Sequence, residues 1–144
     1  MALLNYTTQI EAIKTVSEIM GILVAHGARE VLTQYDDDHR IQALLFNVRT
    51  PQGECEFKLP VDAEATLQVL QRQRVPGRYL NHAQAVRVAW RIVKDWVEAQ
   101  MALLETEMVK LEQIFLPYMV TPQGNTLYEA IRDRYFLLPE GRDD

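Results

Sequence analysis

Hydrophobic and polar positions recur along this chain with two different periods, and the periods divide it into helices and strands. After Thr8, apolar residues such as Ile13, Val16 and Met20 follow one another at intervals of three and four, the spacing of an amphipathic helix. Thr8 and Glu11 have the spacing of a capping box, so we expect the helix to begin there. Gly27 is expected to end it in a left-handed conformation.

The next segment predicts three short strands. The stretches 29–35, 41–50 and 54–60 are separated by the turn sequences "DDDHR" and "PQG". Strands joined by two tight connections form an antiparallel meander. In the third strand Cys55 alternates with Glu54 and Glu56, so we expect the cysteine in the core and the two acids on the solvent face.

The second half of the chain is helical in pattern. Asp62 is expected to cap a helix that runs to about Arg74, where "VPGR" breaks it. Asn81 then opens a pattern with no glycine or proline from residue 82 to residue 116. As one continuous helix, that segment would be about 50 Å long.

A short helix over residues 126–136 closes the pattern. The sequence therefore predicts an α+β fold: an N-terminal helix, a three-stranded antiparallel β-meander, then a helix, one very long helix and a short C-terminal helix. We expect a single domain over residues 1–144, with residues 1–7 and 139–144 frayed.

Two apolar stripes run along the predicted long helix. The first contains Val86, Trp90, Val93, Val97, Met101, Leu104, Met108, Leu111 and Phe115. The second contains Val88, Ile92, Trp96, Ala99 and Leu103. A helix that is apolar on two sides is buried on two sides. We therefore expect a homo-oligomer, a dimer or tetramer, with Val88, Ile92, Trp96 and Leu103 at the interface. The alternative is a kink that folds the helix back on itself.

Charge is distributed unevenly. The net charge is −5, yet residues 65–94 contain no acid and six basic residues, so the other 114 residues carry −11. These six residues form what we call the basic block: Arg72, Arg74, Arg78, Arg87, Arg91 and Lys94. The last three share one face of the predicted long helix, and Tyr79 and His82 add rings that can stack.

The basic block has two interpretations. A cationic strip with aromatic rings suits single-stranded nucleic acid, which would then contact Arg72, Arg74, Arg78, Tyr79, His82, Arg87, Arg91 and Lys94 without sequence specificity. Alternatively the block serves self-assembly. In that case it meets the acidic half of an antiparallel neighbour, and the protein is an interaction module for a host or viral protein partner.

Motifs for catalysis are incomplete. "YDDDHR" (35–40) has the carboxylates and histidine of a divalent-ion site, but aspartate is also a favoured turn residue, and we interpret the segment as a turn. We find no phosphate loop and no nucleophile or zinc motif, so we expect no enzyme, no metal and no cofactor. One cysteine, no export signal and no long apolar window indicate a cytoplasmic protein without a membrane partner, in the host cytoplasm if the chain is viral.

The runs "FKLPVDAEATLQVLQRQRVP" (57–76) and "AWRIVKDWVEAQMALLETEMVKLEQIFLPYM" (89–119) resemble a group of small proteins of bacteriophage and prophage type. The resemblance covers residues 15–130. It implies a context, namely nucleic-acid handling, assembly or inhibition of host machinery. It implies no activity and no site residues.

Overall fold

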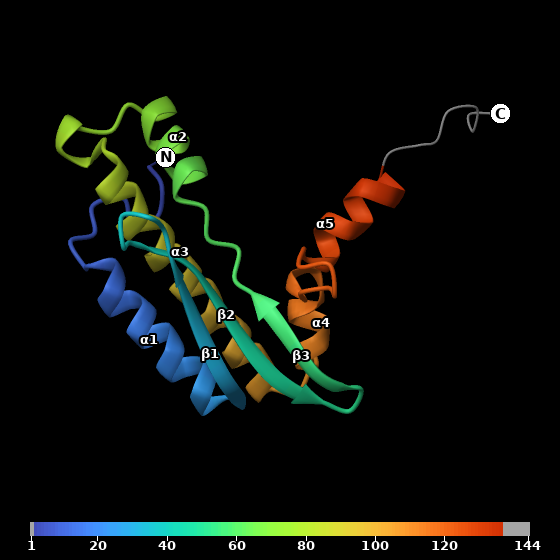
Figure 1. The fold of residues 1–144 in the computed structure, drawn as a ribbon. Helices are drawn as coiled ribbons and strands as arrows, with labels where there is room; N and C mark the ends of the chain where they lie inside the picture. The colour runs from blue at the N-terminus through green and yellow to red at the C-terminus, as the bar shows by residue number, and fades with distance from the viewer. Residues whose placement is uncertain (1, 137–144) are drawn as a thin grey trace.

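The computed structural model describes residues 2–136, and its elements follow the predicted α+β order (Figure 1). The elements are α1 (Ala12–Ala25), β1 (Ala28–Tyr35), β2 (Ile41–Thr50), β3 (Gly53–Lys58), α2 (Ala63–Arg72), η1 (Gly77–Tyr79), α3 (His82–Glu105), α4 (Leu111–Phe115), η2 (Leu116–Tyr118), α5 (Leu127–Ile131) and the π-helical turn η3 (Arg132–Phe136). The N-terminal helix, the three-stranded meander and the short terminal helix are confirmed. Residues 139–144, expected to be frayed, lie outside the described residues.

The three strands form one antiparallel sheet in the order β1-β2-β3. Phe46 in the central strand pairs with Val31 on one side and with Phe57 on the other. Alternation along β2 sends Leu44, Phe46 and Val48 to one face, where α1 and α3 pack (Figure 1). No helix within residues 2–136 packs on the opposite face of the sheet.

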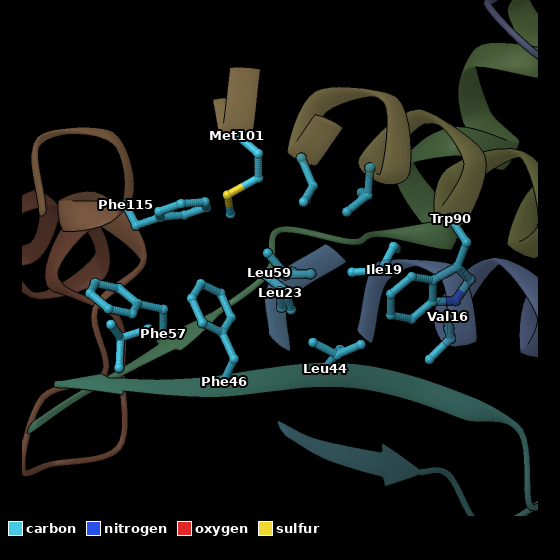
Figure 2. Packing of buried hydrophobic residues seen from close by; sticks show 13 residues of the cluster. Val16, Ile19, Leu23, Leu44, Phe46, Phe57, Leu59, Trp90, Met101 and Phe115 are labelled. Atoms are coloured by element: carbon cyan, nitrogen blue, oxygen red, sulfur yellow. The ribbon is translucent and has the colours of Figure 1, made fainter. Parts of the chain in front are cut away.

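Aromatic side chains form one end of the main core (Figure 2). The Phe115 ring lies 5.3 Å from Phe46, 5.9 Å from Phe57 and 5.5 Å from Trp96, measured between centroids. At the other end Trp90 packs against Val16 and Ile19 of α1. The core therefore needs residues from α1, the sheet, α3 and α4 together.

The prediction of one continuous helix over residues 82–116 is wrong. The long helix α3 ends at Glu105, Glu107 adopts a left-handed φ of 61°, and a separate short helix begins at Leu111. The physical reason is length. The 24 residues of α3 span about 36 Å, which matches the roughly 34 Å of the 10-residue β2. A longer helix would overshoot the sheet, whereas the break returns Phe115 to the core.

The same break covers the second apolar stripe within one chain. Val88 is fully buried, and Trp96 makes edge-on ring contacts with Phe115 and with Tyr118 of η2. Ile92 and Leu103 are half-buried. Four of the five stripe residues are therefore wholly or partly covered within one chain, as the alternative of a folded-back helix anticipated, and Ala99 is exposed. Burial of these four residues does not require a second copy.

Two of the three predicted helix starts are confirmed. The side chains of Asp62 and Asn81 accept hydrogen bonds from the backbone N–H groups of Ala65 and Gln84, each at 2.9 Å. The predicted capping box at Thr8 is not formed, because α1 begins only at Ala12.

The N-terminal segment is packed, although the sequence predicted it to be frayed. Leu3 and Tyr6 cover a second small core made by Leu70, Val75 and Ala85. Asn5 also donates a hydrogen bond to Asp95 of α3 at 2.8 Å. The side of α3 away from the sheet is thus covered at its N-terminal end by α2 and residues 3–6.

Candidate functional site

Three members of the basic block lie in a seam of ion pairs between α3 and α1. Arg91 donates to the Glu18 carboxylate at 2.9 Å, and the Lys94 ammonium lies 3.6 Å from the same oxygen. Lys94 also pairs with Glu98 within α3, and Arg87 lies 3.7 Å from Glu11. The side chains of Arg91 and Lys94 are only 16% and 14% exposed, so these charges hold two helices together.

The protonation of Glu18 reflects this seam. Burial alone would raise the pKa of the Glu18 carboxyl, but the hydrogen bond and charge of Arg91, with the charges of Lys94 and Lys14, lower it overall. The carboxylate is therefore ionised at neutral pH and compensates the positive charges of Arg91 and Lys94 on α3.

The remaining basic residues lie at the end of α2 and in η1. Arg72, Arg74 and Arg78 are exposed, and the Arg78 guanidinium lies 4.9 Å above the centroid of the Tyr79 ring. Arg78 and Tyr79 line a polar cavity of about 560 Å³ together with Arg87. His82 lies at the start of α3, where it faces the β1–β2 turn rather than this cavity. The structure thus divides the eight predicted nucleic-acid contacts among three places.

The acidic turn after β1 is organised by its own backbone. One oxygen of Asp36 accepts hydrogen bonds from the N–H groups of Asp38, at 2.9 Å, and Arg40, at 3.0 Å. The N–H of Arg40 is the main cause of the lowered pKa of Asp36. His39 adopts a φ of 62°, in the left-handed region. Across residues 2–136, no cluster of histidine, cysteine or acidic side chains has the geometry of a metal site.

The two edges of the sheet differ. At β3 the chain covers its own edge, because the N–H of Val120 donates to the carbonyl of Glu56 at 2.8 Å and Met119 bridges to Phe57. At β1 the described residues pair with β2 alone, and no other segment of residues 2–136 adds to that edge. The β1 edge is eight residues long and contains neither proline nor lysine. It carries two charged residues, Arg29 and Glu30, and has register irregularities near both ends, so its regular unpaired part is the middle of the strand.

Exposed apolar residues lie beside this open edge. Ile13 and Val24 of α1 are 61% and 60% exposed, and Leu32 of β1 is 52% exposed. On α1 they belong to what we call the outer flank: Ile13, Ser17, Gly21 and Val24, which fall within about 80° of one another and are all exposed. The outer flank lies opposite Thr15 and Glu18, which contact α3. It therefore faces away from α3, on the β1 side of the molecule.

The sequence pattern grouped Ile13 with Val16, Met20 and Leu23 on one apolar side of the helix. Met20 does pack against the core, whereas Ile13 is exposed, and the outer flank was not identified. Periodicity groups apolar residues on a helix but does not say which of two adjacent stripes meets the sheet. The run Ile13, Ser17 and Gly21, with its small residues four apart, was the available signal.

Comparison with known proteins found no matching family model, no similar curated protein and no matching solved structure. Among the helices of residues 2–136, none combines the length and the apolar character that crossing a membrane requires. The interpretation of function therefore depends on the geometry of the chain itself.

Proposed function

We propose that this protein is an interaction module rather than an enzyme, and that it assembles with a second copy of itself by pairing the two β1 strands. The observation that carries the proposal is the open β1 edge beside the apolar outer flank of α1. An unpaired edge is a template for another strand, and antiparallel pairing of two β1 strands gives a continuous six-stranded sheet.

Sheet geometry restricts how two β1 strands can pair. Directly opposed residues must point to the same face, so the two-fold axis must pass through a residue rather than between two residues. An axis at Glu30 would oppose two like charges, which destabilises a sheet. An axis at Leu32 opposes Leu32 to its copy and Glu30 to Gln34.

The outer flank fits the same two-fold axis. The helix α1 is about 21 Å long and β1 about 27 Å, and a tight turn joins them, so the middle of α1 lies level with the middle of β1. Two antiparallel copies of α1 would then meet at Ser17 and Gly21, and Ile13 of each copy would lie near Val24 of the other. A Cβ added at Gly21 meets no atom within 4 Å in one chain, which leaves room for a neighbouring helix.

Light scattering during size-exclusion chromatography at micromolar concentration tests the proposal. We expect wild-type protein to have twice the mass of one chain. The variants Val24→Arg and Leu32→Lys should be folded monomers, because both side chains are exposed in the single chain. Met108→Arg is the matched control, since Met108 is 69% exposed and lies far along the chain from β1. A wild-type monomer at these concentrations, or a dimer that survives both variants, would contradict the proposal.

Amide hydrogen exchange locates the contact. In an isolated chain, those β1 amides that point away from β2 exchange quickly because they have no acceptor among the described residues. Pairing of two β1 strands should protect them. A dimer that leaves these amides unprotected uses another surface, and protection that requires a foreign polypeptide makes the occupant a different protein.

A second candidate function follows from Arg72, Arg74 and Arg78, which are exposed and make no salt bridge among the described residues. We propose that any single-stranded nucleic acid binds here, without Arg91 and Lys94. Three phosphate contacts give a salt slope of about −2, or a loss of about 20-fold in affinity between 50 and 200 mM salt.

A titration of a labelled oligonucleotide at the two salt concentrations tests the second candidate. The triple variant Arg72→Glu, Arg74→Glu, Arg78→Glu should lose binding. Reversal of Lys110, exposed on a different segment, should leave it nearly unchanged. Absence of wild-type binding at the lower salt concentration excludes this candidate without affecting the self-assembly proposal.

A further inference from the structure

A cavity of about 430 Å³ lies between the β1–β2 turn, the end of β3 and the starts of α2 and α3. Its apolar wall is formed by Ile41, Val61 and Val86, and the buried ring of Trp90 lies at its base. None of these residues belongs to the β1 edge or the outer flank. The lining also includes Gln34 of β1, so the cavity adjoins one end of the β1 edge.

Trp90 presents a hydrogen-bond donor at the base of this cavity. The residue is 1% exposed, yet its indole N–H donates to no acceptor among residues 2–136. A buried tryptophan N–H normally has a partner. Within the described chain, Asn47 Oδ1 is the only side-chain nitrogen or oxygen that is both inaccessible to solvent and without a hydrogen-bond partner. The unpartnered Trp90 nitrogen must therefore retain some accessible surface. Because Trp90 lines the cavity, we place that surface on the cavity side. Figure 2 places this nitrogen on the side of the ring away from Ile19.

Charged side chains of both signs line the mouth of the cavity. The cations Arg40 and Lys58 make no salt bridge within the described residues, and the His82 ring lies beside them. Two helices also begin here, α2 after Asp62 and α3 at His82, and the N-terminus of a helix favours an anion. The two cations and the two helix N-termini therefore line the same cavity as the unpartnered N–H of Trp90.

We infer that this cavity binds a small carboxylate with an apolar body. A carboxylate oxygen accepts the Trp90 N–H, Arg40 and Lys58 compensate its charge, and the apolar part of the ligand lies against Ile41, Val61 and Val86.

A doubly charged phosphate fits this cavity less well than a monoanion. Asp36, Asp62 and Glu64 also line it, so three carboxylates lie beside the two cations Arg40 and Lys58. Asp36 and Asp62 each accept hydrogen bonds from backbone N–H groups, which partly compensate their charge. A second negative charge on the ligand would be repelled, and a phosphate would leave the apolar wall uncovered.

The experiment compares butyrate with n-butylammonium, which has the same alkyl chain and the opposite charge, and with inorganic phosphate. Each is titrated into ¹⁵N-labelled protein while the two indole N–H signals are followed, and Trp96→Phe assigns them. We expect butyrate to shift the Trp90 signal in a saturable manner, with a dissociation constant of about 1 mM for so small a ligand. The Trp96 signal, n-butylammonium and phosphate should give no saturable shift.

Charge variants make the assignment specific. The double variant Arg40→Ala, Lys58→Ala should bind butyrate at least about 10-fold more weakly. The double variant Arg49→Ala, Lys110→Ala removes the same charge outside the cavity and should bind as the wild type does. Fluorescence of Trp96→Phe protein, in which Trp90 is the sole tryptophan, gives a second measurement. An unshifted Trp90 signal, an equal response to n-butylammonium, or unchanged affinity in the cavity variant would overturn the inference.

Discussion

The contribution of a single ion pair to the stability of this protein depends on how deeply its charges are buried. Glu18 pairs with two cations that are less than one-fifth exposed. Its removal leaves Arg91 without its carboxylate partner, while Lys94 keeps Glu98. We expect Glu18→Ala to lower the free energy of unfolding by about 2–3 kcal/mol. Glu56→Ala, at an exposed residue without an ion pair among the described residues, should change it by less than about 0.5 kcal/mol. Urea unfolding followed by circular dichroism measures both changes. Equal effects would show that the ion pairs between α1 and α3 do not stabilise the fold.

The same reasoning changes the expected result of reversing charge on α3. Sequence analysis treated Arg87 and Arg91 as free ligand contacts, so their replacement by glutamate would remove nucleic-acid binding from an intact fold. In the structure Arg91 faces Glu18, and the reversal would place two carboxylates together at a half-buried site. A loss of binding in such a variant would therefore report unfolding rather than a lost contact.

His26 gives the protein a pH dependence near neutrality. Its ring donates from Nδ1 to the carbonyl of Ile22 at 2.8 Å, and its Nε2 lies 3.0 Å from the Glu105 carboxylate. The carbonyl of Ile22 is the largest cause of the raised pKa of His26, followed by Glu105, and burial opposes both. Because the folded pKa is raised, the stabilisation is complete below the unfolded pKa of about 6.5 and is lost as pH rises through the folded value.

We therefore expect the free energy of unfolding to fall between about pH 6 and pH 8, and His26→Gln to flatten that dependence. Urea midpoints at intervals of pH measure it. A wild-type stability that rises over this range, or an equal slope in the variant, would show that another group is responsible.

At the scale of elements, the short helix α4 contributes more to the stability of the core than its length of five residues suggests. Phe115 is fully buried and touches rings from β2, β3 and α3. We expect Phe115→Ala to cost about 4 kcal/mol and to change the fluorescence of the adjacent Trp96. Leu116→Ala, at the neighbouring exposed residue, should cost less than about 1 kcal/mol. Similar losses in the two variants would mean that α4 does not pack as described.

Sequence pattern predicted the elements well and their ends less well. The strands were found because alternation around Phe57 and the turn residues at Asp36 and Gly53 agree. The break after Glu105 was missed because it contains no glycine or proline, and Glu107 takes a left-handed conformation only because the core draws Phe115 back. That is a tertiary cause, which local pattern does not contain.

At the scale of the molecule, self-assembly links stability to concentration. A dimer that dissociates on unfolding has a Tm that rises with protein concentration, whereas a monomer has one that does not. We expect the Tm to rise over a 100-fold range of wild-type concentration. In a chain of this size the rise should be about 2–4 °C for each 1 kcal/mol by which dimer formation stabilises the folded state. Val24→Arg should remove the dependence. Scanning calorimetry measures it, and a constant wild-type Tm would argue for a monomer.

The candidate surfaces were less predictable than the fold. The basic block was visible in the sequence, but its partners Glu11 and Glu18 lie on another helix, about 70 residues away along the chain. The open edge of β1 was not visible, because it depends on Val120 returning to β3 rather than to β1. Which residues cover which edge is decided by the path of the whole chain.

The return of residues 115–120 to the sheet also has a consequence for synthesis on the ribosome. The meander leaves the exit tunnel first, while Phe46 and Phe57 still lack the ring that covers them and β3 still lacks Met119 and Val120. Translation adds roughly 5–20 residues each second, so the sheet has two open edges for several seconds before residue 120 emerges. During that interval the nascent chain is most prone to aggregation. Chaperones that bind exposed strands should bind the open sheet edges and dissociate once Phe115 has packed into the core.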